Sequence, residues 1–84
     1  MTLTFEWATD GSSELTSICR YAFGFCDLDY QNESNPLYLP KNITYVGNGA
    51  FSGNSNLKYI YFEGDTSGFD NYWTDSLTLL PRRN

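Results

Sequence analysis

Carboxylates, tyrosines and thiols are the side chains from which this sequence would have to build a catalytic site, because its 84 residues contain no histidine. That absence removes the commonest general base and metal ligand. The acids that could form a catalytic cluster are Glu6, Asp10, Asp27 and Asp29, and their spacing gives no paired-carboxylate geometry. The acids Asp27, Asp29 and Glu33 also lack the D-x-[DN]-x-[DN]-G order of a calcium loop. We therefore expect neither an enzyme nor a cofactor.

The two cysteines, Cys19 and Cys26, stand seven positions apart. This spacing matches no zinc pattern and no multi-cysteine disulfide framework. Nothing in the sequence brings their Cβ atoms face to face, so a buried free thiol at Cys26 is favoured over a Cys19–Cys26 disulfide.

Charge and hydropathy exclude two classes of partner. Five basic residues against ten acidic ones give a net charge of −5, and the only basic pair is Arg82-Arg83. Nucleic-acid affinity comes from clustered Lys and Arg, so we expect no nucleic-acid binding. No apolar run of about 18 residues is present, which predicts no membrane insertion. The opening stretch MTLTFEWATDGSS also lacks the basic and apolar regions of a signal peptide.

Two short motifs would permit N-linked glycosylation in a eukaryotic secretory route. They are Asn32-Glu33-Ser34 and Asn42-Ile43-Thr44. A motif this short arises often by chance, so the sequence alone assigns neither a role.

One segment is written twice in the chain. LTSICRYAFGFCDL, which begins at Leu15, repeats within LYLPKNITYVGNGAFSGNSNLKYIYF, which begins at Leu37. A constant offset places Leu15 on Ile43, Ile18 on Val46, Ala22 on Ala50, Phe23 on Phe51 and Cys26 on Asn54. Self-similarity at a period of about 20 to 50 residues indicates a repeat architecture.

Three apolar-polar-apolar triplets predict one short strand per repeat: Leu3-Thr4-Phe5, Leu37-Tyr38-Leu39 and Ile60-Tyr61-Phe62. The unit LTSI at 15–18 and its counterpart ITYV at 43–46 are expected as extended turns that place two apolar side chains in a core. An Ala-Phe pair follows each unit, in which the small Ala lets the backbone approach while the Phe is expected to fill the core.

We expect a single domain over 1–84, with repeat-like coils at about 3–28 and 37–57 and a partial one at 60–73. The polar stretch 29–36 is read as an inserted loop, which is either a contact region or a tolerated surface loop. Phe69, Tyr72 and Trp73 have helical i, i+3, i+4 spacing. These aromatics are the candidate cap over the last coil.

These segments resemble the BspA-type leucine-rich repeat family, whose repeat is close to L-x-x-I-x-(I/L)-P-x-x-(I/V)-x-x-I-G-x-x-A-F-x-G-C-x-x-L. The second copy keeps Leu37, Leu39, Pro40, Ile43, Val46, Gly47, Ala50, Phe51, Gly53, Leu57, Ile60 and Phe62, and the first keeps Leu15, Ile18, Ala22, Phe23, Cys26 and Leu28. The resemblance implies a short leucine-rich-repeat solenoid, mostly β, with one short parallel strand per repeat and an aromatic C-terminal cap.

Three departures from the family pattern stand out. Cys19 replaces Gly, Asn54 replaces Cys, and the offset between the copies exceeds the usual repeat of about 23 residues. Asn54 is a compact residue that can bond to a neighbouring backbone turn, as a Cys can more weakly. Cys26, at the family's own Cys position, is accordingly expected in the core.

The resemblance also implies a function, namely a non-enzymatic protein-protein interaction or adhesion module, at the cell surface or outside the cell. Within such a solenoid the middle residue of each strand faces outward, so Thr4, Tyr38 and Tyr61 should form a row, widened by Lys58 and Tyr59. Exposed tyrosines are common on recognition surfaces. The alternative is that Tyr occupies these positions for strand propensity alone.

A second function class stays open. Two coils and part of a third are fewer than the three or so repeats that a solenoid usually needs, and outer strands leave backbone groups to pair. We therefore expect self-association or pairing with a partner chain through the solenoid edges. The alternative function is a structural subunit of a larger assembly, such as a virion, a filament or a surface layer.

Overall fold

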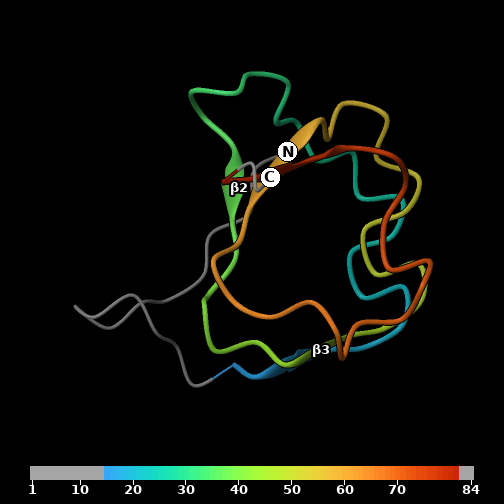
Figure 1. The fold of residues 1–84 in the computed structure, drawn as a ribbon. Coiled ribbons are helices and arrows are strands. Elements are labelled where there is room, and N and C mark those ends of the chain that lie inside the picture. Colours follow the sequence, from blue (N-terminus) through green and yellow to red (C-terminus); the bar gives the residue numbers. More distant parts are fainter. Residues whose placement is uncertain (1–14, 82–84) are drawn as a thin grey trace.

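Five short strands make up the regular structure of the part of the chain that the computed structural model describes, residues 15–81 (Figure 1). They are β1 (Ser17–Ile18), β2 (Leu37–Tyr38), β3 (Tyr45–Val46), β4 (Tyr59–Tyr61) and β5 (Thr78–Leu80). No helix occurs in that range. The protein is therefore a small all-β fold. Some sequence-based expectations fall on residues outside this range. They are the strand at 3–5 with Thr4, the acids Glu6 and Asp10, and the basic pair Arg82-Arg83.

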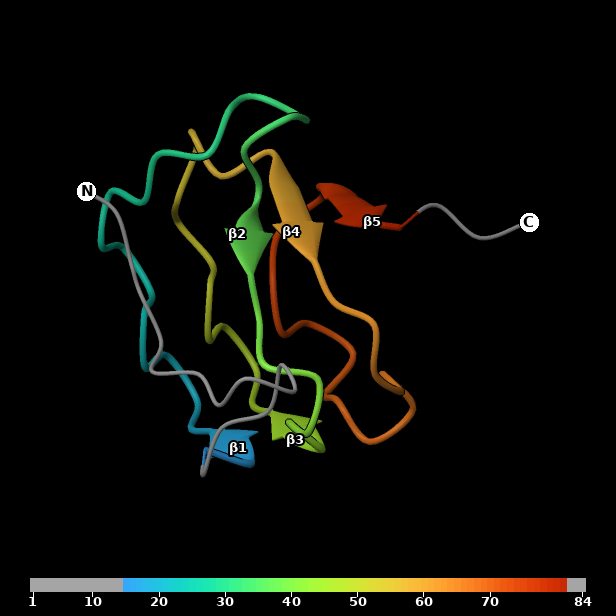
Figure 2. The same cartoon turned by 90° about the vertical axis from the view of Figure 1, so that its left-hand side faces the viewer.

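All strand pairs are parallel, and they form two small sheets. β1 pairs with β3, and β2, β4 and β5 lie side by side in that order (Figure 2). In the first sheet Ser17 lies opposite Tyr45 and Ile18 opposite Val46, which is the offset of the sequence repeat. In the second, Leu37 lies opposite Ile60. Parallel partners need a long crossover, and here the crossovers are the turn segments between the strands.

The turn segments lie alongside one another as well, joined by backbone hydrogen bonds (Figure 1). Phe23 N donates to Ala50 O at 2.8 Å and Phe25 N donates to Ser52 O at 2.8 Å. On the other side of the second copy, Phe51 N donates to Trp73 O at 3.0 Å. Buried backbone groups need such partners, so the turns are paired almost as strands are.

One buried polar side chain, Asn54, ties the two copies together. Its Oδ1 accepts hydrogen bonds from Cys26 N at 3.1 Å and Leu28 N at 2.9 Å. Its Nδ2 donates to Phe23 O at 3.0 Å and to Phe51 O at 2.8 Å. The side chain is 3% exposed, and an amide has the two donors and the acceptor oxygen that this site needs. The expectation that Asn54 would bond to a neighbouring turn is confirmed.

A single apolar core fills the interior of the coils. Its buried members are Ile18, Leu28, Tyr30, Leu37, Leu39, Ile43, Val46, Ala50, Phe51, Leu57, Ile60, Phe62 and Phe69. Phe23, Cys26, Trp73, Leu77 and Leu79 are partly buried against it. Most of the positions that the repeat pattern assigns to the interior are thus buried.

The strand content differs from the sequence-based expectation. The strands at β2 and β4 are found, with β4 beginning one residue earlier than the triplet. The units at 15–18 and 43–46, expected as turns, carry β1 and β3, and the tail adds β5. The segment 37–57 thus carries two strands, β2 and β3, and not one. The reason is that parallel pairing at a fixed register supplies backbone partners that no local pattern shows.

Two further expectations about burial are wrong. Leu15 was expected in the core and is 37% exposed, although its counterpart Ile43 is buried. The loop 29–36 is not only surface, because Tyr30 is buried and bridges to Leu57. Its backbone joins the ladder, with Lys58 N donating to Tyr30 O at 2.9 Å. The segment 69–73 consists of turns and bends.

Candidate functional site

The outward face of β2 and β4 carries a pair of tyrosines. Tyr38 and Tyr61 are register partners, and Leu37 and Ile60 beside them are buried. Because side chains alternate along a strand, burial of these neighbours turns both tyrosines outward. The two ring centroids lie 5.1 Å apart with planes tilted by 45°. Tyr38 is 49% exposed and Tyr61 is half-buried, so the pair presents a joined aromatic surface.

The polar tips of this pair are partly fixed. The hydroxyl of Tyr61 donates to Oε1 of Glu63 at 2.8 Å, which restrains the ring. Tyr59, two positions before Tyr61 in β4, shares its face of the strand and is half-buried. Lys58 immediately precedes β4 and is exposed. The structure thus places Tyr38, Tyr59 and Tyr61 along one sheet, with Lys58 at its start. Thr4 lies outside the described residues. We call Tyr38, Tyr59 and Tyr61 the tyrosine face.

The candidate cap residues divide between the core and the surface. The ring of Trp73 packs edge-on against Phe51 at 6.1 Å and against Phe69 at 5.2 Å. Phe69 in turn lies 5.3 Å from Phe62. Tyr72 is 75% exposed, and it joins the second copy through its backbone, whose carbonyl accepts from Gly49 N at 2.7 Å.

A second aromatic surface, which the sequence reasoning missed, lies on the turns of the first copy. Tyr21 and Phe25 are largely exposed and have φ angles of 57° and 56°, in the left-handed region that non-glycine residues rarely adopt. Their counterparts in the second copy are Gly49 and Gly53, whose φ angles are 70° and 75°. A Cβ on Gly53 would lie 2.3 Å from Cδ1 of Phe25, so the ring rests directly on that glycine. The alignment of the two copies places Tyr21 on Gly49 and Phe25 on Gly53, and these glycines were the sequence signal for a left-handed turn.

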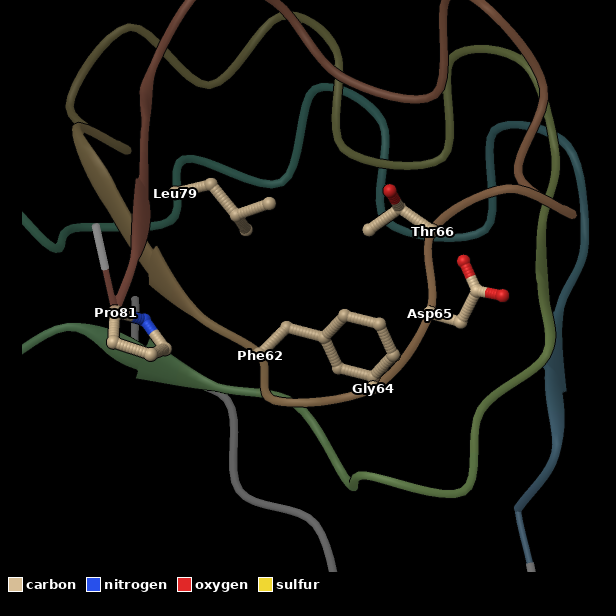
Figure 3. A pocket seen from close by; sticks show the side chains of 6 residues that line it. All are labelled: Phe62, Gly64, Asp65, Thr66, Leu79 and Pro81. Atoms are coloured by element: carbon tan, nitrogen blue, oxygen red, sulfur yellow. The ribbon is translucent and has the colours of Figure 1, made fainter. Parts of the chain in front are cut away.

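A hollow of about 320 Å³ opens beside β5 (Figure 3). Its lining residues are Phe62, Gly64, Asp65, Thr66, Leu79 and Pro81. In the register of the sheet, Leu79 lies opposite the fully buried Ile60, yet it is itself only half-buried. At this edge of the sheet the hollow therefore leaves Leu79 partly exposed, although its register partner is in the core.

A neighbouring carboxylate displaces the pKa of Tyr45. The hydroxyl of Tyr45 donates to Oδ2 of Asp70 at 2.8 Å, and the same oxygen accepts from Asn48 N at 3.0 Å. The hydrogen bond to Asp70, with some desolvation and the repulsion between two negative charges, raises the pKa of Tyr45 above its usual 10.0. This contact joins the start of the second copy to the segment before Trp73.

The potential metal-ligating side chains of residues 15–81 lie apart from one another. No group of three His, Cys, Asp or Glu side chains there is arranged to hold a metal ion. Cys19 and Cys26 are free thiols. Cys26, expected in the core, is half-buried against it, and Cys19 is exposed. No helix of the described chain is long and apolar enough to cross a membrane.

No family model, curated protein or solved structure matches the chain. The likeness to leucine-rich repeats accordingly rests on the residues quoted above.

Proposed function

We propose that the chain is a short leucine-rich-repeat solenoid of the BspA type that binds a protein partner through its tyrosine face, without enzymatic activity. The repeat geometry supports this reading. The register partners Ser17 and Tyr45, and likewise Leu37 and Ile60, are separated along the chain by about the length of one leucine-rich repeat. The rings of successive turns also stack, with Phe23 lying 5.5 Å from Phe51. Phe69 and Trp73 act as the cap.

The observation that carries the functional proposal is the contact between Tyr38 and Tyr61 on adjacent strands. Cross-strand aromatic pairs stabilise a sheet, and they also form a rigid amphipathic platform. Tyrosine supplies large contact area at little conformational cost, which is why it is frequent at binding hot spots. A bound partner would pack on this platform and cover the exposed part of Tyr38.

The test compares two variants of the immobilised full-length chain in capture experiments from cell-surface and secreted protein fractions. Tyr38→Ala with Tyr61→Ala removes the platform, whereas Tyr72→Ala removes an exposed tyrosine on another surface. We expect a partner retained by the wild type and by Tyr72→Ala to be lost from the double variant. Far-UV circular dichroism checks that both variants fold. Equal retention by the double variant, or equal loss from both, would count against the proposal.

A second function, a structural subunit that pairs through its solenoid edges, is favoured by the hollow beside β5. An end strand with the half-exposed Leu79 is a position that another strand or coil would cover (Figure 3). Light scattering over a range of concentrations and electron micrographs test this function. Ordered polymers that Leu79→Ser disperses would favour it. A monomer at all concentrations would exclude it and leave the binding module.

A further inference from the structure

The two glycosylation motifs occupy very different structural settings. Residues 31–35, which contain Asn32 and Ser34, are all exposed. In the other motif Asn42 is half-buried, and Ile43 is 1% exposed within the core. The motif in the loop is therefore accessible from solvent, and the second motif is part of the packed coil.

Asn32 and Ser34 of the first motif bond to each other within the loop. Oδ1 of Asn32 accepts from Ser34 N at 3.2 Å and from Ser34 Oγ at 3.0 Å, and Asn35 N donates to Asn32 O at 3.0 Å. Such an Asx turn is a local surface structure. The asparagine amide and the serine hydroxyl, which the motif requires together, thus lie side by side. Both side-chain bonds use the oxygen of the amide and not Nδ2, the atom that carries a glycan.

The hydrogen bonds of the second motif run to another coil. Thr44 N donates to Thr16 O at 2.7 Å, and Thr44 Oγ1 donates to the same oxygen at 3.3 Å. To present this motif to an enzyme, the chain would have to withdraw Ile43 from the core and break the bonds to Thr16. The loop at 31–35 can open while Ile43 stays in the core and the bonds to Thr16 stay intact. Its opening therefore requires much less free energy than exposing the second motif.

From this contrast we propose that Asn32 is the acceptor of an N-linked glycan in the folded protein and that Asn42 is not. The donor is an oligosaccharide linked to a lipid pyrophosphate. The nitrogen of the Asn32 amide forms a bond to the anomeric carbon of the first sugar, while the bond from that carbon to the pyrophosphate oxygen breaks. The lipid pyrophosphate leaves with the electron pair, and the amide transfers one proton to a base of the transferase. No electron donor or acceptor is needed.

The experiment exposes the folded, full-length chain to a purified oligosaccharyltransferase with a lipid-linked oligosaccharide and reads the product by intact-mass spectrometry. We expect one added glycan. Asn32→Gln and Ser34→Ala should each abolish it, because one moves the acceptor nitrogen away by one methylene group and the other removes the hydroxyl. Asn42→Gln is the matched control and should leave the added mass unchanged.

Two outcomes would overturn the proposal. The first is a glycan on Asn42 of the folded chain, found by peptide mapping. The second is a folded chain that receives no glycan while a peptide of residues 29–36 is modified under the same conditions. As a further check, secretion of the chain from cultured mammalian cells behind a signal peptide should give a product whose glycan is lost only in the Asn32→Gln and Ser34→Ala variants.

Discussion

The two copies of the repeat, residues 15–28 and 43–56, share a pattern and differ in burial. Phe51 is 1% exposed and its counterpart Phe23 is half-buried. The second copy has turns paired to it on both sides, through Phe23 on one and Trp73 on the other. Among residues 15–81, the turns of the first copy pair with those of the second. The buried Phe51, with paired turns on both sides, is therefore expected to contribute more to stability than the half-buried Phe23.

The largest expected difference between the copies lies at their phenylalanines. Phe51→Ala should destabilise the fold by about 3–5 kcal/mol, because it opens a cavity between Phe23 and Trp73. Phe23→Ala should cost less, about 1–2 kcal/mol, since the ring is partly solvated already. Urea denaturation followed by tryptophan fluorescence measures both.

If Phe51→Ala does not fold, the pair Phe51→Leu and Phe23→Leu gives the same order with smaller values. Equal costs at the two positions would mean that a further layer covers the first copy in solution.

The next difference concerns Asn54 and Cys26, which the repeat places at equivalent positions. Asn54→Ala should cost roughly 3 kcal/mol, because Leu28 N and Phe51 O lose their partner inside the protein. Cys26→Ala should cost about 1 kcal/mol, since its thiol makes only a weak contact to Gly24 O at 3.6 Å. Denaturant midpoints compare the two variants. A cost for Cys26→Ala as large as that for Asn54→Ala would contradict the assigned roles.

Much of this arrangement was predictable from the chain itself. The offset between the two copies became the register of β1 with β3, and the Cys-to-Asn replacement pointed to the bonds of Asn54. The exposure of Leu15 was not predictable, because an apolar residue is buried only if a neighbouring coil covers it. Very short strands such as β1 and β3 escape local patterns for a similar reason: their partner defines them.

The tyrosine face was predictable from the sequence, whereas the second aromatic surface was not. Alternation along the strand fixed the outward direction of Tyr38 and Tyr61. The exposed Tyr21 and Phe25 were missed because aromatic residues seldom adopt positive φ, so the alignment with Gly49 and Gly53 was needed to expect it.

A smaller effect is expected at this left-handed position of the turn. Gly53→Ala should cost about 1–2 kcal/mol, because the new Cβ is strained at positive φ and meets the ring of Phe25. In the first copy, Phe25→Asn keeps the backbone conformation with a residue that tolerates it, so the stability should change by less than about 1 kcal/mol. Thermal and urea unfolding test the pair. A large loss in Phe25→Asn would show that the ring packing outweighs the backbone strain.

The smallest expected effect concerns the pKa of Tyr45, whose register partner in the first copy is Ser17. The hydrogen bond from Tyr45 to Asp70 raises the pKa of the phenol in the folded state above the usual 10.0. The bond's contribution to stability is therefore fully present below pH 10 and is lost as the pH rises through the higher folded-state value. Spectrophotometric titration of phenolate absorbance, with Tyr45→Phe subtracted from the wild type, isolates this group. Asp70→Asn should return the midpoint toward 10.0, whereas Ser17→Ala should leave it unchanged. A Tyr45 midpoint that Asp70→Asn does not move would mean that Asp70 does not hold the second copy to the segment that follows it.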